Sequence, residues 1–529
     1  MTDYIDRKTG KGSHSHEGVE GRPNILLVTM DMVPPEFYDG SRDMDTPCQR
    51  SLAEEGVSYT RTFATSPLCG PSRTSILTGR FSYVTGNSER SHDGHAVHLR
   101  SDDIIWPEYL KSMGYHCRHV GKSHVGTEHF MRAFSENSSP WDRWSPPWYN
   151  EDLYIQFLKD KGLERFSFKK EIRGMSWDGE RKGNSYGGWL AEQKGKPFPE
   201  EALYPSYLVE RTISALDTRE NRDVPFYMQL DFFGPHQPFA IPGGWEEREA
   251  EIRKTVQLPE SWLAWEAAGF PSETDDPRVY DLYRKNWGMR NREDLTDYLV
   301  ANQLQYEILD RQLGRLLDYL KEQNLYDNTM ILFTADHGEM NGNKGCVDKG
   351  AYLNPQTMHV PLYLKPSAGQ MKEKNLSPGT VADTPVSLLD ICPTVCEAAG
   401  LDIHERIDGV SFFDTLKSEE RPRDKRIMFD VWNHVVPNPC VGLVFEEKGT
   451  YGLYSYNTTT SRDELYRLDG SKSRLENVID KDAPLTNAAR QKMYAALSGD
   501  ARWDVYNCYF KLEYAEELGL KPGDNQKFE

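Results

Sequence analysis

The sequence predicts an α/β protein with a small antiparallel sheet near its C-terminal end, and two observations carry this prediction. Apolar runs at 24–29, 224–233 and 330–334 have the length and continuity of strands that are buried on both faces, and helical patterns separate them. After about residue 425 the apolar runs are short and are separated by turn residues, as in hairpins. A chain of 529 residues is long enough for one large α/β domain with an appendage.

These patterns divide the chain into three parts. Residues 1–22 are polar and are expected to form a flexible N-terminal tail. Residues 23–425 are expected to form the large domain, which pocket-forming insertions interrupt at about 138–292. Residues 426–529 are expected to form a C-terminal α+β subdomain that ends in a helix from about Asn487.

Composition and charge exclude several classes of protein. The net charge of -19 argues against a general nucleic-acid binder, and it requires a locally basic pocket for any anionic ligand. Eight cysteines at irregular spacing do not form a disulfide framework. No apolar run approaches about 18 residues, so we expect no transmembrane helix and no membrane partner. The polar N-terminus lacks the apolar core of a signal peptide, and a cytoplasmic location is expected.

The first buried strand, at 24–29, is followed by Asp31. Open α/β sheets place their ligand sites at the carboxyl ends of the strands. A lone Asp in such a position is often only a turn residue. The strand at 330–334 ends in the same way, with Asp336 and His337 at its carboxyl end. This second acidic position favours a metal site over a turn.

A twelve-residue segment, Cys-Gly-Pro-Ser-Arg-Thr-Ser-Ile-Leu-Thr-Gly-Arg, begins at Cys69 and has the pattern of a short helix. Ser72 is expected to cap this helix, and Gly79 to end it in a left-handed conformation. The side chain at position 69 would then face free backbone N–H groups and the positive end of the helix dipole. Arg73 adds a guanidinium suited to a tetrahedral anion. The alternative is a buried structural cysteine before an ordinary helix.

Further candidate residues follow in three places. Lys122 and His124 come after a predicted turn and strand at 114–120, and on an extended segment their alternation would point both to one face; an exposed strand end is the alternative. His236 stands between two prolines in a rigid, extended loop, which favours a functional role over packing. Lys349 lies in a loop, where a surface lysine is the alternative.

The clearest helix is predicted at 297–320, where apolar residues at spacings of three and four form one buried stripe. We expect it to cover the sheet without a chemical role, and we expect shorter helices at 104–113 and 385–400. The insertions are rich in tryptophan and are expected to wall a pocket. Tryptophan rings stack on sugars or enclose quaternary amines, although packing of the loops is favoured for most of them. The tryptophans concerned are Trp141, Trp144, Trp148, Trp177, Trp189, Trp245, Trp262, Trp265 and Trp287.

The motif Cys-x-Pro-Ser-Arg followed by Leu-Thr-Gly-Arg, which runs from Cys69 to Arg80, resembles the signature of the type I sulfatases of the alkaline phosphatase superfamily. The segments Gly121–Gly126 and Glu464–Asp469 resemble further elements of that family. The resemblance implies an alkaline phosphatase-like fold, with a large mixed central sheet flanked by helices and a smaller C-terminal antiparallel sheet. It also implies that a formylglycine-generating maturation enzyme oxidises Cys69 to formylglycine (3-oxoalanine), an aldehyde that works as its hydrate.

The resemblance further implies one divalent metal ion, held by Asp31, Asp336, His337 and the modified residue 69. A ligand set rich in oxygen suits a hard cation, and Ca²⁺ is expected. Two positions depart from the pattern of many sulfatases: Met32 stands where a second Asp is common, and His337 where Asn is common. Asp-His at this point occurs in the branch that holds phosphonate monoester hydrolases and choline sulfatases. Imidazole also suits Mn²⁺ or Zn²⁺.

The catalytic roles follow from the same resemblance. One hydroxyl of the hydrate attacks sulfur while His236 protonates the departing alcohol. His124 then removes the proton from the other hydroxyl, which expels sulfate and regenerates the aldehyde. Arg73, Lys122 and Lys349 hold the sulfate oxygens and the hydrate.

The preferred hypothesis is a sulfatase that hydrolyses a sulfate monoester of a small imported molecule. The tryptophan-rich insertions favour a sulfated sugar or glycosaminoglycan fragment over choline sulfate. The alternative is a phosphonate monoester or phosphodiester hydrolase on the same scaffold, which His337 and Met32 keep open. A binding or sensor protein without turnover is disfavoured, because every expected polar role is filled. The expected partners are the sulfate ester and the maturation enzyme, with no nucleic acid, and a homo-oligomer stays open.

Overall fold

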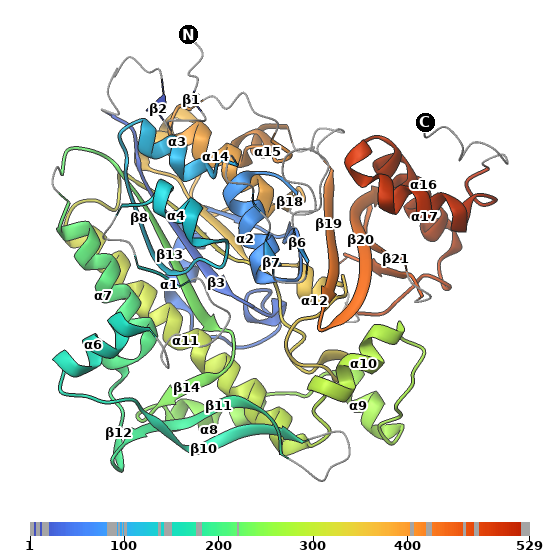
Figure 1. The fold of residues 1–529 in the computed structure, drawn as a ribbon, viewed down its shortest axis with the longest axis horizontal. Helices are drawn as coiled ribbons and strands as arrows, with labels where there is room; N and C mark the ends of the chain where they lie inside the picture. Colours follow the sequence, from blue (N-terminus) through green and yellow to red (C-terminus); the bar gives the residue numbers. More distant parts are fainter. Residues whose placement is uncertain are drawn as a thin grey trace.

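The structure is a computed structural model that describes most of the chain (Figure 1). The predicted tail lies outside the described residues except for short pieces, and so do Trp144, Trp148 and Trp177 of the insertions. The described residues are 5–6, 11–12, 21–81, 92–93, 96–97, 99, 103–135, 139–141, 151–175, 182–219, 222–401, 407–418, 426–458, 462–469 and 475–519.

A mixed sheet of eight strands forms the centre of the molecule. The apolar runs predicted as buried strands are β3 (Asn24–Asp31), β13 (Phe226–Pro235) and β15 (Thr329–Ala335), and all of their residues are buried. Strand β16 (Leu362–Lys365) runs antiparallel to both of its neighbours, whereas the other described neighbours in this sheet run parallel. The strand order is β17 (Thr380–Ala382), β4 (Val57–Tyr59), β16 (Leu362–Lys365), β15, β3, β13, β8 (His116–Lys122) and β9 (Ser139–Trp141).

Helices cover both faces of this sheet, and alternate side chains of β13 show which helices lie on which face. Tyr227 packs against Trp106, with ring centroids 4.7 Å apart. Phe232, which points the other way, lines a small cavity together with Leu208 and Leu309. The predicted fold class, a large mixed sheet flanked by helices, is therefore confirmed. The face of Tyr227 carries α2 (Cys69–Thr78), α3 (Trp106–Ser112) and α4 (Thr127–Ala133), and the opposite face carries α7 (Tyr204–Asp217) and α11 (Arg292–Glu322).

The smaller C-terminal sheet is also present, at the right of Figure 1. Its four strands are antiparallel and follow chain order, so each pairs with the next. Two helices pack against it, and Phe510 meets Tyr456 with ring centroids 4.8 Å apart. The elements are β19 (Ile427–His434), β20 (Val436–Glu447), β21 (Thr450–Asn457), β22 (Glu464–Arg467), α16 (Ala483–Ser498) and α17 (Asp504–Tyr514).

The insertions form a region with its own hydrophobic core, in the lower part of Figure 1. Trp189, Trp245, Trp262 and Trp265 are buried in this core, so these four rings pack the insertions. The elements of this region are β10 (Ser167–Met175), β11 (Lys182–Gln193), β12 (Lys196–Pro197), β14 (Phe239–Pro242), α8 (Glu246–Thr255), α9 (Glu260–Ala267) and α10 (Arg278–Trp287).

Two predicted helices have different ends in the structure. Helix α11 extends the prediction in both directions, and Asn291 caps it by accepting bonds from the backbone N–H groups of Glu293 and Asp294. Helix α14 (Ile391–Ala398) begins later than residue 385, because Val386–Ser387 pairs with strand β5 (Thr62–Phe63). Among the described helices, none combines the length and the apolar composition that crossing a bilayer requires. The remaining elements are β1 (Ile5–Asp6), β2 (Lys11–Gly12), α1 (Pro47–Glu55), β5 (Thr62–Phe63), β6 (His92–Asp93), β7 (Ala96–Val97), α6 (Asp152–Asp160), α12 (Pro355–Met358), α13 (Ala368–Glu373), β18 (Val386–Ser387) and α15 (Phe412–Ser418).

Gly79 ends α2 with a φ of 68°, and a Cβ at this position would lie 2.8 Å from Cys392 Sγ and 2.9 Å from Ile407 Cγ2. Gly79→Ala is expected to lower the free energy of unfolding by about 2–4 kcal/mol, because the costs of a left-handed alanine and of overpacking add. Gly449→Ala is the matched control: its φ is 81° but the space around it is open, so a loss of about 1 kcal/mol is expected. Urea denaturation measures both losses, and equal losses would contradict the packing argument.

Candidate active site

Helix α2 carries the predicted nucleophile in its first turn. Its N-cap is Leu68, and Cys69 is its first residue, so the helix begins three residues before the predicted cap. The prediction that Ser72 caps the helix is wrong: its hydroxyl donates instead to the backbone oxygen of Asp336, at 2.6 Å. The predicted left-handed end at Gly79 is confirmed. The Cys69 side chain therefore lies where backbone N–H groups have no helical acceptor and the helix dipole is positive.

The carboxyl edge of the sheet brings two strand ends next to α2. Strands β3 and β15 are parallel neighbours, and Asp31 is the last residue of β3. Asp336 and His337 follow β15 directly, and the backbone N–H of Asp336 donates to Met30 O at 3.1 Å. Met32 turns away with a φ of 64°, and its backbone N–H donates to Asp336 Oδ1 at 3.1 Å. The two carboxylates therefore lie side by side at the place where α2 begins.

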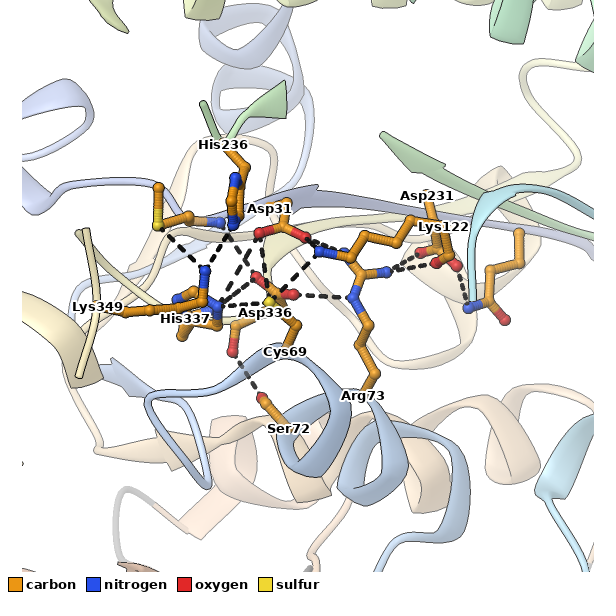
Figure 2. Close-up of polar contacts among 12 residues, drawn as sticks. Asp31, Cys69, Ser72, Arg73, Lys122, Asp231, His236, Asp336, His337 and Lys349 are labelled. Carbon is orange, nitrogen blue, oxygen red and sulfur yellow. Dashed lines mark hydrogen bonds and ion pairs between the residues drawn. The ribbon is translucent and has the colours of Figure 1, made fainter. Parts of the chain in front are cut away.

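Four potential metal ligands meet at this edge (Figure 2). The Cys69 sulfur lies 3.6 Å from Asp31 Oδ1 and 3.1 Å from His337 Nε2. Asp336 Oδ1 lies 3.7 Å from the same imidazole nitrogen. The four ligand atoms all lie within 4.8 Å of one another, and their residues are buried.

The orientation of these side chains suits an ion at their centre. His337 Nδ1 lies 2.9 Å from Gly338 O, which fixes the ring and turns Nε2 toward the cluster. Asp31 and Asp336 each direct one oxygen toward the sulfur and the imidazole, while the second oxygen of each pairs with a cation. Two carboxylates, one imidazole and residue 69 form a donor set that fits a divalent cation.

Two buried cations hold the outer carboxylate oxygens. Lys122 Nζ lies 2.5 Å from Asp31 Oδ2 and 3.4 Å from the Cys69 sulfur. Arg73 Nε lies 2.8 Å from Asp336 Oδ2, and its Nη2 lies 3.4 Å from Asp31 Oδ2. Figure 2 shows both cations reaching the cluster from the same side. The charges of the two carboxylates are thus compensated without solvent.

These charges shift the pKa values of the thiol and the imidazole. Burial by itself would raise the pKa of Cys69, but Lys122 and the neighbouring cations outweigh it and lower the pKa to about 7. Burial by itself would lower the pKa of His337, but Asp336 and Cys69 outweigh it and raise that pKa to about 9. Near neutral pH the Cys69 thiol of the ion-free protein is therefore about half ionised, beside an imidazolium.

A second pair of side chains borders the cluster. The backbone N–H of His236 donates to Asp31 O at 3.1 Å, so the loop carrying His236 is tied to the end of β3. Lys349 Nζ lies 2.6 Å from His236 Nε2, and His236 Nδ1 lies 2.5 Å from Gln237 O. Desolvation and then the Lys349 charge lower the pKa of His236 to about 3. The imidazole is therefore neutral, with Nε2 accepting from the ammonium and Nδ1–H donating to the carbonyl.

The structure brings Asp31, Cys69, Arg73, Lys122, His236, Asp336, His337 and Lys349 into one connected cluster. The backbone conformation of His124 differs from the predicted one. Strand β8 ends at Lys122, and His124 has a φ of 53°, so the extended alternation that placed both side chains on one face is wrong. The role of His124 stays a prediction.

Sequence reasoning missed Asp231, which lies 3.4 Å from Arg73. The signal was present, since Gln229 and Asp231 are polar at alternate positions of an otherwise apolar strand and so share a face.

Solved structures of phosphonate monoester hydrolases share this fold. A solved structure with the same fold is the phosphonate monoester hydrolase of Agrobacterium radiobacter, with a TM-score of 0.66 and 18% identity, covering 90% of this chain and 96% of that one.

The chain belongs to the sulfatase family, whose family model matches residues 23–401. It is 28% identical to human iduronate 2-sulfatase over 77% of this chain and 74% of the relative. It is 23% identical to the N-acetylglucosamine-6-O-sulfatase of Bacteroides thetaiotaomicron over 87% of this chain and 83% of the relative. The protein is therefore a sulfuric ester hydrolase.

The charge balance predicts how the Cys69 thiol titrates in the ion-free protein. Its thiolate should form as the pH rises through about 7. Lys122→Met removes the ammonium 3.4 Å from the sulfur, so the midpoint should move to higher pH because the thiolate loses a neighbouring cation. The ultraviolet absorbance of the thiolate, measured in EDTA as a difference from Cys69→Ser, gives this midpoint.

Lys365→Met is the control for this measurement. Lys365 is also buried, but it donates to the backbone oxygen of Tyr326 at 2.9 Å, away from the cluster. Its loss should leave the midpoint unchanged. An unmoved midpoint in Lys122→Met, or equal shifts in both variants, would contradict the assignment.

Proposed function

We propose that this protein is a formylglycine-dependent sulfatase that uses a divalent metal ion. One observation carries the proposal: the Cys69 sulfur, at the start of a helix, shares a buried cluster of ligand atoms with Asp31, Asp336 and His337. When Cys69 is converted to formylglycine this sulfur is lost and Cβ becomes the aldehyde carbon, so the hydrate oxygens would form beside two carboxylates and an imidazole. A structural cysteine needs no such neighbours.

Asp31, Asp336, His337 and the hydrate of residue 69 would hold the ion. Three of these four residues offer oxygen, which favours Ca²⁺, and the imidazole leaves Mn²⁺ or Zn²⁺ as the alternatives. When present, the ion and the aldehyde hydrate supply a nucleophilic hydroxyl for attack on sulfur and a route for expelling sulfate.

Three cations of the chain bind and orient the ester. Arg73, Lys122 and Lys349 carry positive charge at the edge of the cluster, and all three are buried. Negative charge grows on the ester oxygens and on the departing oxygen during hydrolysis. Fixed cations in a site that excludes water stabilise that charge more than solvent does.

His236 supplies the proton for the departing alcohol, and the charge of Lys349 controls when this imidazole is protonated. In the free site the imidazole is neutral and accepts from the Lys349 ammonium, 2.6 Å away. A bound sulfate group brings negative charge next to Lys349 and offsets the charge that lowers the pKa of His236. With its pKa raised in this way, His236 can take up a proton and donate it to the alcohol oxygen, while Lys349 keeps its charge on the sulfate. His124 is proposed as the base that acts when sulfate is expelled.

The proposed substrate is a sulfated sugar or glycosaminoglycan fragment. The relatives named for iduronate and N-acetylglucosamine sulfates support it. A phosphonate monoester or phosphodiester hydrolase is the second candidate, and the imidazole of His337 in the ligand cluster is what favours it.

Two measurements test the proposal on protein made together with a formylglycine-generating enzyme. Mass spectrometry of the peptide that carries residue 69 should show the aldehyde, and an unmodified thiol would contradict the proposed nucleophile. Hydrolysis of an aryl sulfate should exceed that of a phosphonate monoester and of a phosphodiester in kcat/KM. Phosphorus substrates that react faster by orders of magnitude would establish the second candidate.

The loss of activity on replacing His236, the proposed acid, should depend on the leaving group of the substrate. His236→Gln should lower kcat for an alkyl sulfate by about 100-fold or more, and kcat for 4-nitrophenyl sulfate much less, because nitrophenolate departs without a proton. His359→Gln is the control, since this histidine binds Tyr38 and the backbone of Thr60 away from the cluster. Equal losses on both substrates would assign His236 to binding alone.

A further inference from the structure

A third buried carboxylate, Asp231, faces the guanidinium of Arg73. Asp231 lies on β13, is 1% exposed, and places Oδ1 3.4 Å from Arg73 Nη1. Figure 2 shows it on the far side of Arg73 from Asp31 and Asp336. The roles proposed for the reaction leave this residue without one.

Asp231 is held in place by two donors that bind its other oxygen. His119 Nε2 and Gln229 Nε2 both lie 2.7 Å from Asp231 Oδ2. Tyr227 donates to Gln229 Oε1 at 2.7 Å, which extends this series of hydrogen bonds along one face of β13. The His119 ring packs edge-on against Phe130, with centroids 4.7 Å apart. This buried arrangement directs Oδ1 toward Arg73 and fixes it there.

Arg73 is shared between this carboxylate and the proposed ion ligands. Its guanidinium contacts Asp336 Oδ2 at 2.8 Å and Asp31 Oδ2 at 3.4 Å, and it donates to Lys122 O at 2.8 Å. An ion bound by Asp31 and Asp336 would repel a guanidinium that depends on the same two carboxylates. Asp231 gives Arg73 a partner on the opposite side, which the ion does not contact.

We propose that Asp231 is a positioning residue that anchors Arg73 and so leaves Asp31 and Asp336 available to the metal ion. The proposal rests on the proposed function, because it assumes that these carboxylates bind an ion. Without Asp231, Asp31 and Asp336 are the only carboxylates that pair with the Arg73 guanidinium. The guanidinium then competes with the ion for these two carboxylates. A purely structural role, in which Asp231 only joins β13 to β8 through His119, predicts no such competition.

The test is calorimetric titration of CaCl₂, and separately of MnCl₂, into the ion-free full chain made together with a formylglycine-generating enzyme. Asp231→Asn keeps the size of the side chain and removes its charge. It should raise the Kd of the ion about tenfold, the effect expected when an outer partner of a metal site is lost. Asp310→Asn is the matched control: Asp310 is fully buried and accepts from the backbone N–H groups of Cys48 and Gln49, away from the site. It should bind the ion with the Kd of the wild type.

A double-mutant cycle shows whether Asp231 acts through Arg73. Arg73→Met and the double variant Arg73→Met/Asp231→Asn should bind the ion with equal Kd, because the group that Asp231 anchors is gone. Where Asp231→Asn does not fold, Gln229→Leu takes its place: it removes one of the donors that hold Asp231, so it should also raise the Kd, and an unchanged Kd overturns the role of Asp231.

The outcomes separate the two proposals. A Kd for Asp231→Asn equal to that of the wild type and of Asp310→Asn overturns the role of Asp231 and leaves the proposed function standing. A further loss in the double variant relative to Arg73→Met overturns the route through Arg73. A wild-type protein that binds neither ion, or one whose binding survives Asp336→Asn, overturns the proposed metal site and the role of Asp231 with it.

Discussion

The parallel pairing of β3 with β15 is the constraint on which the site depends, because it sets Asp31 and Asp336 side by side where both are fully buried. Two carboxylates whose nearest oxygens lie within 4.8 Å repel each other strongly when water is excluded. Lys122 and Arg73 balance the repulsion by pairing with the outer oxygens. The loss of one partner from such a pair leaves a buried charge uncompensated, at a cost of about 3–5 kcal/mol. The cations that are proposed to bind substrate are therefore also required for the site to form.

Features that depend on short stretches of sequence were predictable. Continuous apolar runs gave the three central strands, and the carboxyl ends of parallel strands must meet, so the neighbourhood of Asp31 and Asp336 followed. Gly79 ends its helix as expected, since few residues other than glycine adopt a left-handed conformation without strain. The cap at Ser72 failed because the helix already begins at Cys69, so Ser72 lies inside it, where its hydroxyl donates to the backbone oxygen of Asp336. The capping preference of a single residue does not determine where the helix begins.

Contacts between segments that lie far apart in the chain could not be predicted from the sequence pattern. Lys349 meets His236, which lies 113 residues earlier, and no periodicity within either loop encodes that contact. His124 adopts a left-handed φ, so an argument from strand alternation could not hold beyond the end of β8. The burial of four tryptophans in the core of the insertions likewise depends on partners that only the folded chain brings together. The pairing of Asp231 with a cation could have been predicted in principle, because a buried charge inside a strand is stabilised by an opposite charge on the same face.

The net charge of -19 and the cationic site are compatible because they act over different distances. Exposed charges are screened beyond about 8 Å at physiological salt, whereas Arg73, Lys122 and Lys349 are buried and act on an ester at contact. In the ion-free site, however, Lys122 and Arg73 are already paired with Asp31 and Asp336. An incoming sulfate would have to compete with those carboxylates. In the proposed function the ion takes the negative charge of the two carboxylates, which frees the cations for the ester oxygens, so ion binding must come before productive substrate binding.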